Sequence, residues 1–167
     1  TASYDSVASL SALEGVVSTY LADLRYASET WGLKYSRVFN YDASSRAAIR
    51  EMQRQVGYLR VNGEGIAWKG LIIRHLILPN GLAGSRESLS WLVDEISPEI
   101  TVSVMSQYYP AHRARQTPLI SRQISIPEYT EVLEMLDDLG IENGWVQDMD
   151  APKNYLPDFS RREHPFV

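Results

Sequence analysis

The amino-acid sequence predicts an α/β domain built on a parallel sheet. Four segments rich in β-branched and aliphatic residues alternate with amphipathic helical patterns. These four segments lie at residues 16–24, 71–78, 100–106 and 144–148. Such alternation produces right-handed βαβ units, in which consecutive strands run parallel. Because 167 residues with 44% hydrophobic content suit one domain, we expect residues 1–150 to form it and 151–167 to wrap its surface.

The first strand is expected between two irregular stretches. Asp5 and Ser6 can cap a short helix that Gly15 ends, because their side-chain oxygens accept orphan N–H groups and glycine adopts the left-handed conformation. Segment 16–24 follows directly and is too short and uncapped for a helix. Residues 25–42 show no clean period, which predicts a long, ordered loop.

A helix and a hairpin are expected between the first and second strands. Residues 43–56 carry apolar side chains at helical spacing, with arginines on another face, as in a surface helix packed on a sheet. Residues 58–68 alternate around the sequence NGEG, whose residues tolerate positive φ, and this predicts a small hairpin. The apolar run 71–78 is typical of a parallel strand covered on both faces.

The two later connections carry clearer helix signals. Pro79 stops the second strand, and Ser85 is expected to cap the helix that follows it. Ser125 and Glu128 have the spacing of a capping box, ahead of a helix that Gly140 ends.

Composition excludes several classes of function. The formal net charge of -5 is distributed without any Lys/Arg block that could follow a phosphate backbone, so nucleic acid is not an expected partner. The absence of cysteine excludes a disulfide framework and a thiolate metal site. No signal peptide and no apolar stretch of ~20 residues is present, so we expect a cytoplasmic protein that does not span a membrane. The chain opens without methionine, and we expect it to be a piece of something longer.

Candidate site residues follow from the predicted sheet, because functional groups of parallel βα folds gather at the carboxyl ends of the strands. This rule selects Asp23 and Arg25 after the first strand and Arg74 within the second. Gln107 and Tyr109 follow the third strand. We assign no catalytic residue and no metal ligand.

Arg74 and His75 are neighbours in an apolar strand, so their side chains point to opposite faces. An arginine is costly to bury unpaired, so Arg74 must meet an anion. Two partners stay open: the Asp23 carboxylate on the neighbouring strand, or a carboxylate or phosphate of a ligand. His75 is expected to be a packing residue, whereas His112 and His164 lie in polar loops without metal-ligand spacing.

Longer motifs carry a resemblance to a known family. The segments IRHLILP, MSQYYP and GIENGWVQ, together with ADLRY, occur in the order and spacing of the C-terminal half of radical S-adenosylmethionine proteins related to pyruvate formate-lyase activating enzyme. The chain resembles this half over almost its whole length. The resemblance implies a partial (β/α) TIM-like barrel whose opening residues follow the third strand of the family barrel. The missing N-terminal half is then the first expected partner.

The resemblance also implies a chemistry for the intact parent. Family members hold a [4Fe-4S] cluster on three cysteines, and S-adenosylmethionine bound to it is cleaved to a deoxyadenosyl radical. In activating enzymes this radical removes hydrogen from a glycine of a partner, a glycyl radical enzyme. Asp23 and Arg25 stand where the family usually has Asp-Leu-Lys near the methionine part of the cofactor, and Arg74 matches a family arginine near that ligand. Gln107 and Tyr109 are candidates for the rim of the site.

One departure limits what this chain can do. Without cysteine the cluster cannot be held here, so we expect the chain alone to be inactive and the parent to be an oxidoreductase. An isolated half would expose a sheet edge and apolar surface, which favours self-association.

Two other functions stay open. The first is an interaction domain that docks a partner protein through the aromatic loop between Trp31 and Tyr41. The second is a cysteine-free, non-redox barrel enzyme that binds an anionic metabolite through Arg74. Too few strands for a closed barrel count against the second.

Overall fold

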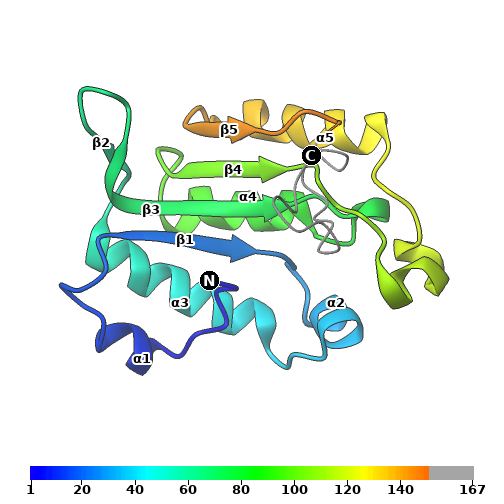
Figure 1. Cartoon of the computed structure of the whole chain (residues 1–167), viewed down its shortest axis with the longest axis horizontal. Coiled ribbons are helices and arrows are strands. Elements are labelled where there is room, and N and C mark those ends of the chain that lie inside the picture. The colour runs from blue at the N-terminus through cyan, green and yellow to red at the C-terminus, as the bar shows by residue number, and fades with distance from the viewer. Residues whose placement is uncertain (151–167) are drawn as a thin grey trace, which may run out of the picture.

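A sheet with four parallel strands forms the centre of the molecule (Figure 1). The computed structural model describes residues 1–150, so the predicted surface tail at 151–167 lies outside the described residues. The parallel strands follow the order β1-β3-β4-β5, and β2 pairs antiparallel with the start of β3. The bounds are β1 Thr19–Leu24, β2 Arg60–Val61, β3 Ala67–Leu76, β4 Thr101–Met105 and β5 Gly144–Val146. The predicted α/β fold with a parallel sheet is confirmed.

Three α-helices connect the parallel strands on one face of the sheet. They are α3 Tyr41–Val56, α4 Ser85–Glu95 and α5 Ile126–Asp138. Crossovers between parallel strands are right-handed as a rule, and each new strand is added on the same side of the last, so the connecting helices share one face. Buried residues of β1, β3, β4 and these three helices form one core cluster. Burial of this shared apolar surface is the main force that holds helices and sheet together.

Within residues 1–150, the three connecting helices do not cover the opposite face of the parallel sheet (Figure 1). Asp23, Arg74, Ser103 and Trp145 are register partners across the strands and therefore point to this face. Trp145 is 54% exposed, and Leu21, two residues before Asp23 on β1 and so on the same face, is 45% exposed. A parallel sheet covered by helices on one face, with strands added in one direction, is compatible with part of a β/α barrel wall.

The first strand is shorter than predicted. Ser6 caps α1 (Val7–Ser11), as expected, through a hydrogen bond from the Ser9 N–H to its Oγ of 3.0 Å. The turn that follows α1 continues further, because the N–H groups of Val16 and Val17 both donate to the Leu13 carbonyl. The strand therefore begins at Thr19 rather than at residue 16.

The predicted loop 25–42 contains short helical turns. Ser28 caps α2 (Glu29–Trp31), and the chain continues into the π-helical turn η1 (Gly32–Ser36). Helix α3 then begins at Tyr41, inside the predicted loop. Turns this short do not repeat an apolar position often enough to produce a periodic signal, which explains why the sequence pattern missed them.

The predicted hairpin and second strand are one continuous feature. The hairpin consists of β2 paired with the first residues of β3, so β3 starts at Ala67 rather than at residue 71 and ends at Leu76. Gly70 has φ of 126°, and a Cβ at this position would lie 2.4 Å from the Leu59 Cα. Only glycine lets β3 pass this close to the backbone that leads into β2.

Of the predicted N-caps of α4 and α5, one is wrong and one is confirmed. The capping box of Ser125 and Glu128 is confirmed at the start of α5. The expectation that Ser85 caps α4 is wrong: Gly84 is the N-cap, and Ser85 is the first helical residue. Its hydroxyl instead contacts His75 at 2.9 Å.

Three 3-10 turns complete the described chain: η2 Pro79–Gly81, η3 His112–Gln116 and η4 Pro118–Ile120. Between residues 1 and 150, no helix has the length and apolar character that crossing a membrane requires.

Candidate functional site

An ion cluster lies at the carboxyl end of β1 and β3. Asp23 and Arg74 are direct register partners on these adjacent strands. The Arg74 Nε and Nη2 groups donate to Asp23 Oδ1 at 2.6 and 2.5 Å. Arg25, one residue beyond β1, donates from Nη2 to Asp23 Oδ2 at 2.8 Å. The internal partner that the sequence left open for Arg74 is therefore present, and the same carboxylate also binds Arg25.

Burial divides this cluster into a covered anion and two accessible cations. The Asp23 side chain is 7% exposed, whereas the side chains of Arg25 and Arg74 are 45% and 38% exposed. Burial lowers the pKa of the Arg25 guanidinium, but the hydrogen bond and charge of Asp23 outweigh it and leave that pKa above its ordinary value. Two guanidinium groups are thus held in place by one carboxylate, with one excess positive charge facing outward.

The Tyr41 hydroxyl fixes the backbone that carries these charges. It accepts a hydrogen bond from the Arg25 N–H at 3.1 Å and donates to the Asp23 carbonyl at 3.1 Å. Burial is the main reason that the pKa of Tyr41 is raised to about 12, so the hydroxyl keeps its proton and can donate. Sequence reasoning placed Tyr41 in the aromatic loop and missed this role, because the contact joins the start of α3 to the end of β1.

A cavity of about 300 Å³ opens beside the ion cluster. Its polar wall consists of the three charged residues and Gln107, and its remaining wall is apolar and aromatic. The apolar and aromatic lining residues are Tyr26, Leu76, Leu78, Met105 and Tyr108. A small anion with an apolar body fits such a lining, since few polar groups fix its orientation while apolar atoms bury the rest.

The two predicted rim residues have different positions. Gln107 lines the cavity, and its Oε1 accepts a hydrogen bond from Gln147 Nε2 at 3.2 Å. Tyr109 does not line the cavity, and its ring lies 6.0 Å from the Arg115 guanidinium instead. Its neighbour Tyr108 takes the lining position. Gln147 follows the last strand at its carboxyl end, so the strand-end rule could have selected it.

His75 points to the helix face of the sheet, opposite to Arg74. Its ring is fully buried, with Nδ1 2.8 Å from the Leu24 carbonyl and Nε2 2.9 Å from Ser85 Oγ. Since a carbonyl can only accept, Nδ1 carries the proton and Nε2 accepts from the serine hydroxyl. Burial lowers the pKa of His75 to about 4, so the ring is neutral. This environment is that of a hydrogen-bonded packing residue, as expected; His112 is exposed, and His164 lies outside the described residues.

The residues of this site suit an anion better than a metal. Within the part of the chain that the structure describes, no three His, Cys, Asp or Glu side chains come together as a metal site. The sequence also holds no cysteine, so thiolate ligands for an iron–sulfur cluster are missing from this chain. An iron–sulfur cluster therefore does not fit this chain, whereas the pair Arg25 and Arg74 fits a carboxylate or a phosphate.

Comparison with known proteins finds similarity to a protein that is itself uncharacterized. The chain is 29% identical over 140 residues to the uncharacterized protein MJ0674 of Methanocaldococcus jannaschii, an alignment that covers 83% of this chain. The chain spans 37% of the length of that relative. No protein-family model and no solved structure matches the chain.

Proposed function

We propose that this chain is the C-terminal part of a radical S-adenosylmethionine barrel enzyme similar to pyruvate formate-lyase activating enzyme, and that its ion cluster orients the cofactor's carboxylate. The observation that carries this proposal is the pair of accessible guanidinium groups, Arg25 and Arg74, that one buried carboxylate holds at the carboxyl ends of adjacent strands. Both arginines belong to the motifs ADLRY and IIRHLILP, which carry the family resemblance.

The ion cluster of Asp23, Arg25 and Arg74 supports recognition of the cofactor's carboxylate. A guanidinium pair recognises a carboxylate through charge-assisted hydrogen bonds. A contact between Asp23 and the ammonium group of the cofactor's methionine part lacks this support, because both Asp23 oxygens already accept from Arg25 and Arg74. We therefore assign Asp23 the role of positioning the two arginines. Gln107 lines the cavity and can add a neutral hydrogen bond, and Tyr109 is no longer assigned a contact.

The iron–sulfur cluster belongs to the rest of the parent on this proposal. When bound there, it would supply the electron that cleaves the cofactor. This chain contributes binding and orientation, and by itself it is inactive in that reaction. A glycyl radical enzyme as protein substrate and a cytoplasmic location stay predictions.

The missing partner of the fold is proposed to be the N-terminal half of the barrel. The Thr1 ammonium donates to the Leu21 carbonyl at 2.8 Å, and the Asp23 N–H donates to the Thr1 carbonyl at 2.9 Å. This pair of bonds is the pattern of a parallel bridge, so the free edge of β1 accepts backbone in the direction of a further parallel strand. The sheet face that the connecting helices do not cover and the 37% share of the relative's length agree with such a half. Without it, self-association through that face is expected.

Calorimetric titration of S-adenosylmethionine into the chain tests the proposal. We expect saturable binding that Arg74→Ala weakens about 10- to 100-fold, the equivalent of one hydrogen bond to a charged group. Arg86→Ala is the matched control, because Arg86 is 51% exposed and pairs with Asp138 on the helix layer. If Arg74→Ala and Arg86→Ala bind S-adenosylmethionine equally well, the assignment of Arg74 to the binding site is wrong. If the unaltered chain binds nothing, the same pair of variants in a full-length parent decides whether the missing half is required.

A non-redox enzyme for an anionic metabolite is the second candidate, since the same arginine pair would serve it. Succinate and inorganic phosphate are suitable probes, and binding of either one in preference to S-adenosylmethionine would favour this candidate. The third reading, an interaction domain that uses the aromatic loop, receives less support. Trp31 and Tyr35 stack at 5.7 Å in an apolar cluster with the buried Tyr41, and Phe39 is the clear exception at 64% exposure.

A further inference from the structure

A basic surface lies at the carboxyl end of the strands, beside the cavity. The chain has no acidic residue between Ile100 and Pro127, although it has arginines at 113, 115 and 122 and although its net charge is -5. Residues 25–41 add Arg25, Lys34 and Arg37 against one acid, Glu29. We name Arg25, Lys34, Arg37, Arg113 and Arg115 the basic rim. Arg122 is left out because Glu128 balances its charge, whereas Arg25 shares Asp23 with Arg74, which leaves one positive charge in excess.

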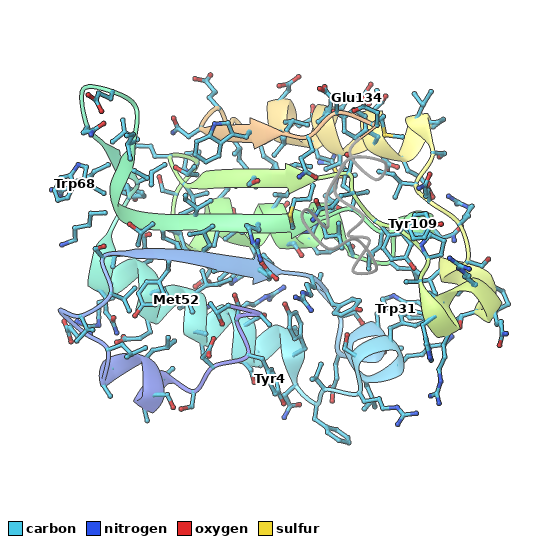
Figure 2. All side chains as sticks on the ribbon, in the orientation of Figure 1. Tyr4, Trp31, Met52, Trp68, Tyr109 and Glu134 are labelled. Carbon is cyan, nitrogen blue, oxygen red and sulfur yellow. The ribbon has the colours of Figure 1, made fainter. Side chains whose placement is uncertain are left out.

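The two segments of the basic rim are neighbours in the fold. Tyr108 and Ile120 pack in the same apolar cluster as Trp31 and Tyr35, which joins the loop after β4 to the helical turns after β1. Figure 2 shows the labelled Trp31 and Tyr109 at the end of the molecule toward which the strands run, whereas Trp68 lies at the other end. Asp23 at this end pairs with Arg25 and Arg74, and Glu128 pairs with Arg122. Asp42 and Glu87 lie in the first turns of α3 and α4, and Asp148 and Asp150 follow β5. The rim cations without a carboxylate partner lie at η1 and in the loop after β4.

Two of the rim cations, Arg115 and Lys34, lie over aromatic rings. The Arg115 guanidinium lies 6.0 Å from the Tyr109 ring centre, and its Nε donates to the Pro110 carbonyl at 3.2 Å. Lys34 Nζ lies 5.2 Å from the Trp31 ring and 5.4 Å from that of Tyr35. Within residues 1–150, Lys34, Arg37, Arg113 and Arg115 form no salt bridge with a carboxylate. Cations ordered in advance bind an anion at a smaller entropy cost.

The loop that carries Arg113 and Arg115 is long and yet tied down. It connects β4 to α5 and includes the 3-10 turns η3 and η4. The Asn80 side chain donates to the Leu119 carbonyl at 2.7 Å, and the Tyr108 hydroxyl donates to the Ile120 carbonyl at 2.7 Å. These bonds hold the loop in one shape.

We infer that the basic rim docks an acidic polypeptide segment of a partner protein. The cations belong to two separate segments, which suits an extended chain better than a small ligand. Exposed Leu33 and Leu119, each 39% exposed, offer apolar contacts that a peptide also uses. Opposite charge on the two surfaces steers the encounter and rejects basic partners. The inference does not require S-adenosylmethionine to be the ligand of the neighbouring cavity.

Fluorescence anisotropy on the 167-residue chain tests this inference. The probe is a labelled peptide that alternates glutamate with leucine and glycine, compared with the same peptide carrying glutamine. We expect the glutamate peptide to bind, its affinity to fall with salt, and the double variant Arg113→Glu/Arg115→Glu to weaken it about tenfold or more. The control is Arg60→Glu/Lys69→Glu, which makes the same change of charge on the hairpin, where these two residues are register partners.

Three results would overturn the inference. Equal loss in the rim and hairpin variants would show that only total charge matters. Equal binding of the glutamine peptide would show that charge is not recognised. Tighter binding of a single-stranded RNA, lost in the same rim variant, would identify a nucleic acid as the partner class instead.

Discussion

Glu128 joins three separate parts of the chain, and its replacement by glutamine is the most informative stability test. Glu128 Oε1 accepts the Asn80 N–H at 2.6 Å and Arg122 Nη2 at 2.8 Å. Glu128 Oε2 accepts Arg122 Nη1 at 2.7 Å and the Ser125 N–H at 2.8 Å. One carboxylate thereby ties η2, the loop between β4 and α5, and the first turn of α5 together.

The magnitude follows from what Glu128→Gln removes. The amide keeps one acceptor oxygen and turns an NH₂ group toward a guanidinium and backbone donors. Hydrogen bonds to charged groups contribute about 1.5–3 kcal/mol each, and a helix cap contributes about 1 kcal/mol. The side chains of Glu128 and Arg122 are 19% and 46% exposed, so solvent screens part of this gain. We therefore expect a net loss of about 3 kcal/mol in the free energy of unfolding.

Urea unfolding, followed by circular dichroism, measures this loss. With a slope of about 2 kcal/mol per molar urea, the midpoint should fall by about 1.5 M. The matched control is Glu131→Gln on the same helix, an exposed residue for which we expect a change within about 0.5 kcal/mol. The hydrogen bond from Arg122 is the main reason that the pKa of Glu128 lies well below its usual range.

The pH dependence supplies a second readout for Glu128. A carboxyl whose pKa is depressed on folding contributes stability above its unfolded pKa of about 4.5, and this contribution is lost as the pH falls below that value. The difference between the original chain and Glu128→Gln should therefore shrink in acid. If Glu128→Gln and Glu131→Gln change the free energy of unfolding equally at neutral pH, Glu128 does not stabilise the chain by joining these three parts.

Three further changes have defined outcomes. Asp23→Asn leaves two guanidinium groups without their carboxylate and should cost about 2 kcal/mol in urea unfolding, against less than about 0.5 kcal/mol for the exposed Asp138→Asn. Burial depresses the pKa of His75 to about 4, so the unfolding free energy should rise with pH between about 4 and 6.5, and His75→Gln should flatten the upper part of this profile. Gly70→Ala should destabilise the chain by more than about 3 kcal/mol, because its Cβ meets backbone atoms, whereas Gly15→Ala should cost only about 1 kcal/mol, because nothing lies within 4 Å.

Each of these expectations can fail in a specific way. Equal costs of Asp23→Asn and Asp138→Asn would show that the ion cluster contributes no more than a surface pair. An unchanged pH profile between 5 and 6.5 in His75→Gln would show that His75 is not buried as a neutral ring, since ordinary carboxyl groups are already ionised there. Equal losses in Gly70→Ala and Gly15→Ala would show that positive φ, and not the close approach to Leu59, sets the cost.

Local patterns anticipated the elements whose signals lie within a few residues. The capping box at Ser125, the helix that ends at Val56 and the hairpin before β3 all follow from spacing that a single element contains. Segment boundaries were less reliable. Ser85 has the composition of a cap, but a neighbouring glycine with φ of 63° takes that position, because the serine hydroxyl bonds to a buried histidine on another element.

The predictions for the candidate site were also correct for some residues and wrong for others. Strand ends selected Asp23, Arg25, Arg74 and Gln107, and all four line one cavity in the structure. The same rule placed Tyr109 beside them, although Tyr108 takes that position. Alternation along the chain could not decide between these neighbours, because both follow the end of β4 and the backbone there is no longer a regular strand.

The sequence by itself determined the class of the fold, the order of strands and helices, and the absence of thiolate ligands, because periodicity, capping and composition are properties of nearby residues or of the whole chain. Only the tertiary structure decided that Arg74 shares Asp23 with Arg25 and that Tyr41 bonds to the backbone of Asp23 and Arg25. It also decided that the loop between β4 and α5 lies beside Trp31. These contacts join residues far apart in the chain, and which pairs meet depends on the register of the strands and the packing of the core.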